Sequence, residues 1–320
     1  MKTPQILVLG AGPAGAAAAL GLKRMGYHVV VASRERRVDA LEGVSARVLQ
    51  ALDVAGLHRA CAAVADRVPR QVRWNAGADS INTELLVERR VFDRALRADL
   101  IEAGVEVIDA GIGGVTSGAD GHRVQLQCGA SLREIEAGFL VEARGRQAPG
   151  MATQLAGPAT LTLLMRWMGT PGAPASAIES MEEGWSWMAR MANGSASWQL
   201  TLHAAGKRVP SKDALSDFCL ATFDRTWGRT FFGSERPVAP QVCARTSGAV
   251  LCAQAAGDNW LRVGDAAMAV DPLSGNGIFQ SLSSALQAPA VRANERRRPP
   301  MTAVGVEGQG WRDFLCWRRR

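Results

Sequence analysis

The spacing of three glycines near the start of the chain restricts its fold more than any other feature. Gly10, Gly12 and Gly15 fit the pattern G-x-G-x-x-G between an apolar run at residues 5–9 and an alanine-rich run at residues 16–25. In a strand–loop–helix unit the first glycine permits a tight turn, the second lets a pyrophosphate approach the backbone, and the third packs the helix closely on the strand. We therefore predict a dinucleotide-binding site here. A packing turn in an unliganded α/β domain is the alternative.

The end of the second expected strand, at residues 28–32, bears on how the nucleotide is held. Dinucleotide-binding folds usually carry an acid at this point, where it accepts hydrogen bonds from the ribose hydroxyls. This chain has Ser33 followed by Arg34 instead. Ser33 can still make one hydrogen bond to a ribose, whereas Arg34 suits either a phosphate or solvent.

A second glycine-rich loop lies near the other end of the chain. An apolar run at residues 261–263 is followed by Gly264 and Asp265, then by a loop at residues 271–277 and an apolar helix pattern at residues 278–286. An acid at a strand end can reach a sugar hydroxyl, and a glycine-rich loop that opens a helix offers backbone N–H groups to an anion. Two such loops, far apart in the sequence, predict one long ligand that is held from both sides.

The chain between the two loops changes character along its length. Up to residue 155, expected strands alternate with expected helices, at residues 44–54 and 91–103 among others, as is typical of a Rossmann-like α/β domain. Strand patterns dominate from residue 156. We predict that residues 1–155 and 256–291 form the two parts of the nucleotide-binding domain. Residues 156–255 would form an inserted, mostly antiparallel β-sheet substrate domain that includes a helix at 211–226. Residues 292–320 would form a basic, disordered tail.

Tryptophans are concentrated in the predicted substrate domain. Strand patterns at residues 161–168, 177–181, 185–191 and 197–202 contain four of the nine tryptophans of the chain. Trp185 and Trp187 are separated by one residue, so on a strand their side chains point to the same side. We predict that one face of this sheet carries aromatic side chains and binds a flat apolar substrate, with Trp185 and Trp187 as the contacts. A tryptophan-rich core is the alternative.

Charge, cysteines and histidines exclude several classes of function. The formal net charge is +7, but eight arginines and three acids in residues 292–320 account for +5 of it. The body of the chain is therefore nearly neutral, which argues against nucleic acid as a partner. Six cysteines without a C-x-x-C pair and four dispersed histidines predict reduced thiols, no metal site and a cytoplasmic protein. The apolar residues 6–22 resemble a signal peptide or membrane span, but phosphate binding explains their glycines better.

Together the two loops resemble those of the flavoproteins of the aromatic-hydroxylase and tryptophan-halogenase superfamily, whose FAD-binding domain is of the GR2 type. Residues 10–15 (GAGPAG) match the first FAD motif of that superfamily. Gly264-Asp265, Asp271-Pro272 and the Gly275-x-Gly277 pattern match its late motif, and residues 142–145 (EARG) stand where it has D-A-[TS]-G. Residues 42–52, 73–75, 141–149, 182–191 and 271–291 are similar to the LodB/GoxB/QhpG-type monooxygenases, which mature peptidyl quinone cofactors in partner proteins.

The resemblance implies FAD as the cofactor and assigns residues to it. The pyrophosphate contacts are Gly10, Gly12, Pro13, Ala14 and Gly15, and Ser33 is the candidate ribose contact. Gly264 and Asp265 belong to the ribose and ribityl region. The residues nearest the isoalloxazine are Pro272, Gly275, Asn276 and Gly277. Arg47 and Arg90 stand where the superfamily often has flavin-contacting arginines, although each suits a surface ion pair equally well. No side chain is assigned a catalytic role, because the chemistry belongs to the flavin.

The implied reaction is monooxygenation of an aromatic ring through a flavin C4a-hydroperoxide, with O2 as co-substrate and a tryptophan side chain of a partner polypeptide as substrate. Electrons would come from NAD(P)H directly or from a separate reductase, since no second dinucleotide motif is present. A hydroxylase of a free small aromatic metabolite is an alternative. Halogenation is disfavoured because such enzymes need a pocket lysine, and residues 24–206 contain none.

The arginine-rich residues 292–320 stand where members of this superfamily continue with a helical region. This difference predicts a truncated or altered C-terminal region. It also leaves open a truncated, inactive FAD-binding remnant.

Overall fold

The two glycine-rich loops belong to one parallel sheet. The protein is described by a computed structural model over residues 5–36, 38–75, 80–149, 154–182, 184–204, 210–233 and 236–296. Strand β1 (Ile6–Leu9) is fully buried and leads through the first loop into α1 (Pro13–Arg24). Proline suits the first position of a helix, where its missing N–H has no partner to lose. Strand β2 (Val29–Ser33) then pairs parallel to β1, so the predicted strand–loop–helix–strand unit is present.

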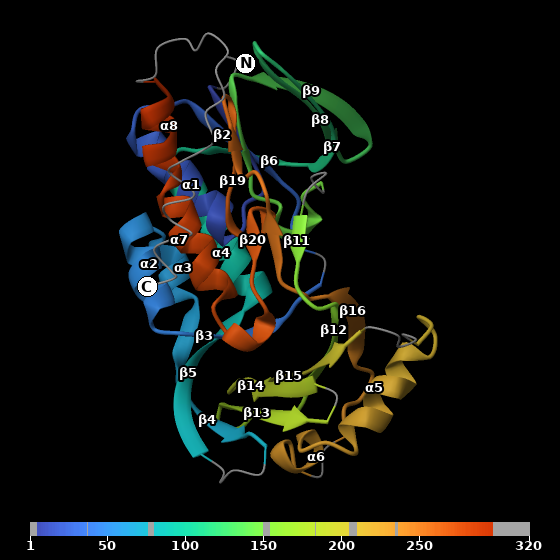
Figure 1. Ribbon diagram of the computed structural model, residues 1–320. Helices are drawn as coiled ribbons and strands as arrows, with labels where there is room; N and C mark the ends of the chain where they lie inside the picture. Colours follow the sequence, from blue (N-terminus) through green and yellow to red (C-terminus); the bar gives the residue numbers. More distant parts are fainter. Residues whose placement is uncertain are drawn as a thin grey trace.

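The parallel sheet has six strands in the order β18-β19-β10-β1-β2-β6 (Figure 1). Its other strands are β6 (Glu106–Asp109), β10 (Phe139–Glu142), β18 (Ala256–Gly257) and β19 (Trp260–Arg262). All pair in parallel except β18, which pairs antiparallel to β19. Because β19 joins β10 beside β1, the late glycine loop begins at the same sheet edge as the first one.

Helices cover one face of this sheet and a β-meander covers the other (Figure 1). The helical layer contains α1, α2 (Arg47–Ala55), α3 (His58–Ala62), α4 (Arg89–Glu102), α7 (Gly277–Leu286) and α8 (Ala288–Arg296). The meander consists of β7 (Gly111–Gly118), β8 (Gly121–Cys128) and β9 (Ser131–Ala137). Helix α2 begins later than the predicted residue 44 because residues 41–44 pair as a strand. Helix α8 continues to Arg296, past the predicted start of the tail at residue 292, and residues 297–320 lie outside the described residues.

A second, larger sheet has eight strands in the order β16-β12-β15-β14-β13-β4-β5-β3. Five of its strands come from the predicted substrate domain: β12 (Thr160–Met168), β13 (Ala175–Met181), β14 (Gly184–Arg190), β15 (Ser195–His203) and β16 (Gln241–Thr246). The other three, β3 (Leu41–Val44), β4 (Val64–Arg73) and β5 (Ser80–Glu88), come from the first part of the chain. They join through the parallel pair β13–β4, the one parallel pair in this sheet, so both segments build one surface.

A small three-stranded sheet stands between the two larger ones. It is formed by β11 (Gln154–Ala156), β17 (Val250–Cys252) and β20 (Met268–Ala269). In the described part of the chain, no helix is long and apolar enough to cross a membrane.

The tryptophans of the large sheet are divided between its two faces. Trp167 and Trp198 point to the face covered by α5 (Leu215–Phe223) and α6 (Gly228–Phe231), where they pack edge-on against Phe223. Trp185 and Trp187 point to the opposite face. The expectation of a single aromatic face is therefore corrected, because residues of opposite parity on paired strands face opposite sides. The helix predicted at 211–226 is shorter in the structure: α5 spans Leu215–Phe223, and α6 begins beyond the predicted range at Gly228.

We expect Trp198→Ala to lower the free energy of unfolding by about 3–5 kcal/mol, because it empties the largest fully buried side-chain site of this core. The measurement is the denaturation midpoint at unchanged m-value. Val238→Ala is the control, since Val238 is 80% exposed. A loss of less than about 1 kcal/mol for Trp198→Ala would mean that this core tolerates the cavity.

Candidate active site

In the first loop, two glycines allow close packing of the backbone, and the third leaves open space for a ligand. A Cβ on Gly10, whose φ is +109°, would lie 2.6 Å from the Ala143 carbonyl oxygen. A Cβ on Gly15 would lie 1.9 Å from the Gly10 carbonyl oxygen, whereas a Cβ on Gly12 would meet no atom within 4 Å. Gly10 and Gly15 therefore permit close packing of β1, α1 and the chain after β10. Gly12 leaves open space at the start of α1, where backbone N–H groups favour an anion.

The late motif packs directly on this loop. Gly264 has φ +60°, and a Cβ there would lie 2.7 Å from the Ala14 Cβ. Its backbone N–H donates to the Ser284 hydroxyl at 2.8 Å, which ties the end of β19 to α7. The structure therefore brings the first loop and the Gly264-Asp265 pair together, although they are about 250 residues apart in the sequence.

Asp265 is the acid at this junction. Its carboxylate lies 3.7 Å from the Arg146 guanidinium. Burial raises the pKa of Asp265, the positive charge of Arg146 lowers it, and the negative charge of Glu42 raises it; the net pKa is above its ordinary value. Burial of a carboxylate costs free energy unless a donor binds it closely. The hydroxyl of a bound ligand could donate to Asp265 and supply this hydrogen bond.

The raised pKa gives a test in the protein without cofactor. The folded state binds the Asp265 proton more tightly than the unfolded state does, so protonation of Asp265 stabilises the folded protein. This stabilisation is complete below the ordinary pKa of 3.8 and is lost as the pH rises through the folded-state pKa. Asn cannot ionise. We therefore expect the melting temperature of Asp265→Asn, minus that of the parent, to increase over this pH window and then level off. A difference that is flat or decreasing with pH would contradict the prediction.

Contacts within the loop at residues 271–277 fix its conformation. The Asp271 carboxylate accepts from the Leu273 N–H at 2.9 Å, and Gly275 adopts φ +58° before α7 begins at Gly277. A Cβ on Gly275 or Gly277 would meet no atom within 4 Å. The Arg47 guanidinium donates to the Asn276 side-chain oxygen at 3.0 Å and lies 4.6 Å from the centre of the Phe279 ring. Arg47 therefore joins α2 to the start of α7.

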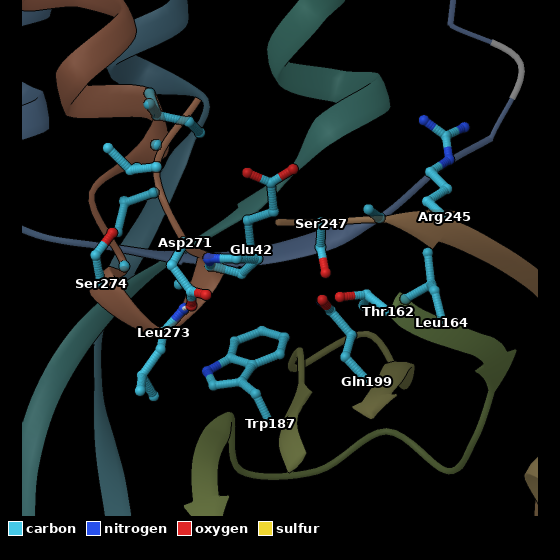
Figure 2. Close-up of a pocket in the computed structure, with 18 of the residues that line it drawn as sticks. Glu42, Thr162, Leu164, Trp187, Gln199, Arg245, Ser247, Asp271, Leu273 and Ser274 are labelled. Carbon is cyan, nitrogen blue, oxygen red and sulfur yellow. Dashed lines mark hydrogen bonds between the residues drawn. The ribbon is translucent and has the colours of Figure 1, made fainter. Parts of the chain in front are cut away.

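A cavity of about 330 Å³ separates this loop from the large sheet. Strands from both edges of the sheet, β3 and β16, contribute to its wall, so the sheet curves around it. Figure 2 shows the Trp187 ring between Asp271 and Leu273 on one side and the polar ends of Thr162, Gln199 and Ser247 on the other.

Only some of the predicted substrate and cofactor residues line this cavity. Its lining residues include Trp185, Trp187, Asp265, Pro272, Gly275 and Gly277. Residues 10–15 pack on Gly264, which directly precedes the lining residue Asp265. The other predicted residues that are not part of the lining are Ser33, Arg47, Arg90, Gly264 and Asn276. Ser33 is at the end of β2, where its hydroxyl donates to the Arg34 carbonyl oxygen at 3.4 Å. Arg90 lies at the start of α4, and its backbone N–H donates to the Asp39 carboxylate at 3.0 Å.

Two acids in the cavity wall were missed by the sequence analysis. Glu42 accepts from the Arg89 guanidinium at 2.7 Å, and Arg89 also binds Asp93 at 3.0 Å. Burial lowers the pKa of Arg89, but the two carboxylates outweigh it and raise the pKa above its ordinary value. Glu84 accepts from the Trp187 indole N–H at 3.0 Å. These contacts join strands and helices far apart in the sequence, and only the Arg89–Asp93 pair has a local signal, its i,i+4 spacing.

The residues present at the two glycine loops fit FAD. A Cβ on Gly12, Gly275 or Gly277 would meet no atom within 4 Å, and Asp265 lines the cavity together with Gly275 and Gly277, so both loops present accessible backbone to a ligand. Within the described ranges, no cluster of three His, Cys, Asp or Glu side chains could hold a metal ion. No lysine lines the described cavity, and Lys23 donates to the Gly104 carbonyl oxygen away from it.

Solved structures of flavin-dependent enzymes share this fold. The peptidyl tryptophan dihydroxylase QhpG, essential for tryptophylquinone cofactor biogenesis, is 51% identical, with a TM-score of 0.86 over 93% of this chain and 68% of its own. The flavin-dependent halogenase CmlS is 19% identical, with a TM-score of 0.78 over 93% of this chain and 59% of its own. Halogenase PltM, solved with phloroglucinol and FAD, is 16% identical, with a TM-score of 0.73 over 92% of this chain and 70% of its own.

The two halogenases show the fold alone, at these identities. They confirm the predicted architecture of a Rossmann-like α/β domain joined to a mostly antiparallel sheet. Among curated proteins, digeranylgeranylglycerophospholipid reductase 1 of Methanopyrus kandleri is 26% identical over 87% of this chain and 77% of its own length. No protein-family model matches the chain.

Proposed function

The chain belongs to the family of the peptidyl tryptophan dihydroxylase QhpG, and we propose that it is an FAD-dependent monooxygenase that adds oxygen to a tryptophan side chain of a partner polypeptide. The observation that carries this proposal is the identity of 51% with QhpG over 93% of the chain. The cavity between the late glycine loop and the paired tryptophans supports it, because it offers an aromatic ring a place beside the predicted cofactor site.

The residues that would hold FAD come from both glycine loops. Gly10, Gly12 and Gly15, with Pro13 and Ala14, would face the pyrophosphate, and Gly264 and Asp265 would face the ribose and ribityl region. Pro272, Gly275, Asn276 and Gly277 would lie beside the ring system, with Arg47 bracing Asn276. When bound, reduced FAD supplies activated oxygen to an electron-rich ring.

The chain's own contribution is to orient the ring and to limit the access of water. Trp185 and Trp187 form an apolar surface opposite residues 272–275, and Leu164 and Ile178 extend it. Apolar walls around a reactive oxygen species reduce its loss to water. Thr162, Gln199 and Ser247 provide polar contacts on one side of the cavity, where they can hydrogen-bond to the polypeptide backbone of the substrate.

Mass spectrometry of a partner polypeptide tests the proposal. The FAD-loaded protein is incubated under ¹⁸O₂ with a reductant and a tryptophan-containing partner polypeptide of a quinone-bearing enzyme. We expect one or two labelled oxygen atoms on the tryptophan ring. Running the reaction with NAD(P)H alone, and then with an added flavin reductase, identifies the electron source. Oxygenation of a free aromatic compound, with none on any polypeptide, would favour a small-molecule hydroxylase and overturn the polypeptide substrate.

A further inference from the structure

We propose that Glu84 is a positioning residue for the aromatic substrate: it holds the Trp187 indole as a fixed wall of the cavity, and Gly43 lacks a side chain to make room for it. This inference rests on the proposed function for the identity of the substrate. It goes beyond it in assigning roles to two residues that lie outside both glycine loops.

The bond between Glu84 and Trp187 spans the concave side of the large sheet. Trp187 is on β14 and Glu84 is on β5, and strands β13 and β4 lie between them. Neighbouring strands are about 4.8 Å apart, so in a flat sheet the two backbones would be roughly 14 Å apart. Their side chains nevertheless meet, with the indole Nε1 at 3.0 Å from the Glu84 Oε1. The bond therefore crosses the floor of the cavity and braces its curvature.

Both partners are largely removed from water. Trp187 is 7% exposed, and the Glu84 side chain is 9% exposed. The second carboxylate oxygen of Glu84 is 3.9 Å from the Arg70 guanidinium, which is too long for a hydrogen bond. Of the Trp187 and Arg70 side chains, only Trp187 donates to the Glu84 carboxylate within hydrogen-bond distance. A buried hydrogen bond to a charged acceptor is stronger than a neutral one, so it restricts rotation of the indole.

Gly43 provides independent support for the position of this carboxylate. A Cβ on Gly43 would lie 2.1 Å from the Glu84 Oε2, and its other near contacts are also carboxyl atoms of Glu84. Gly43 is on the edge strand β3 and lines the cavity, as Glu84 does. A methyl group there would push the carboxyl away from Trp187, because the end of a flexible side chain moves more readily than the backbone.

The consequence is a fixed orientation for any ring that enters. The Trp187 indole faces the loop that contains Asp271 and Leu273 across the cavity (Figure 2). An aromatic ring placed between them is restricted to stacked or edge-on contact with an indole whose rotation the Glu84 hydrogen bond restricts. Freed from Glu84, the indole could rotate into the cavity and compete for this space.

The experiment uses the full-length, FAD-loaded protein and N-acetyl-tryptophanamide, a minimal peptide-linked tryptophan, as the probe. Calorimetry measures its dissociation constant, and the ¹H–¹⁵N spectrum of ¹⁵N-tryptophan-labelled protein reports the Trp187 indole N–H, assigned by its loss in Trp187→Phe. We expect Glu84→Ala to shift this N–H signal and to weaken probe binding about tenfold, the factor that corresponds to ~1.4 kcal/mol. Glu84→Gln, which keeps an acceptor, is expected to recover most of the affinity.

Two further variants separate positioning from general stability. Gly43→Ala should reproduce the signal shift and the weaker binding of Glu84→Ala although it retains the carboxylate. In a Trp187→Phe background, Glu84→Ala should change probe affinity by less than about twofold, because residues that act through one contact are not additive. Additive losses, or an unshifted indole signal in Glu84→Ala, would overturn the inference. A parent that binds the probe but oxygenates no polypeptide would overturn the proposed function instead, and the binding data would still decide the role of Glu84.

Discussion

The Gly12→Asp variant is expected to bind FAD more than tenfold more weakly than the parent, a loss of at least ~1.4 kcal/mol. A Cβ at Gly12 meets no protein atom within 4 Å, so the space that it faces is open in the folded protein. An aspartate would fill this space and place a negative charge where the phosphates of the cofactor are expected. Repulsion between like charges and the loss of close approach to the backbone act in the same direction. Flavin absorbance of the purified protein and titration with FAD measure the effect.

The matched control for this variant is Gly172→Asp. Gly172 also has open space where its Cβ would be, and it lies in an exposed segment between β12 and β13, away from both glycine loops. It introduces the same side chain and the same charge. We expect it to bind FAD like the parent. If Gly12→Asp also retained FAD at the parental affinity, residues 10–15 would not be the pyrophosphate site.

The parts of the site that depend on local backbone geometry could be predicted from the sequence. Gly10 adopts a φ of +109°, and a Cβ on Gly15 would collide with the Gly10 carbonyl oxygen five residues earlier. The pattern G-x-G-x-x-G is a signature of these two requirements. The late motif is recognisable for the same reason, because Gly264 and Gly275 adopt positive φ angles at fixed positions in its turns. The positive φ angles and the contact between Gly15 and Gly10 arise within short segments, so a short pattern is sufficient to reveal them.

The large sheet shows what local patterns leave undetermined. Trp185 and Trp187 share a face, as alternation predicts, but alternation alone does not decide which face is the cavity and which is the core. That assignment depends on cross-strand register: Trp187 lies opposite Gln199, which lines the cavity, and Met188 lies opposite Trp198, which is in the core. Strand β16 was not predicted, because its six residues combine polar and apolar side chains without a strong period.

The participation of β3, β4 and β5 in this sheet depends on pairing across distant segments. Strand β4 joins β13 in parallel, with Val72 opposite Ile178, more than 100 residues away in the sequence. The pattern of apolar and polar residues within 41–88 does not indicate that this segment pairs with a strand more than 100 residues away. Glu42, Gly43 and Glu84 reach the cavity only through this pairing, which is why the sequence analysis assigned none of them to the site.

Replacing Trp185 or Trp187 by Ala is expected to impair oxygenation of the polypeptide much more than FAD binding. Both side chains line the cavity, whereas Trp167 and Trp198 are in the core on the other face. Removal of an aromatic wall loses stacking with the substrate ring and admits water, so we expect kcat/KM to fall at least about tenfold, which corresponds to ~1.4 kcal/mol of transition-state stabilisation. The dissociation constant of FAD should change by less than about threefold, because neither side chain belongs to the glycine loops.

Trp74→Ala is the control for these two variants. Trp74 is 37% exposed at the end of β4 and is not part of the cavity lining, so its loss should leave kcat/KM and FAD affinity near those of the parent. Peroxide release is measured alongside oxygen incorporation, since water that enters the cavity diverts activated oxygen away from the product. We therefore expect the Trp185 and Trp187 variants to form more peroxide per electron pair consumed. Equal losses of oxygenation and FAD affinity, or a loss of solubility alone, would instead assign the two tryptophans to the core of the sheet.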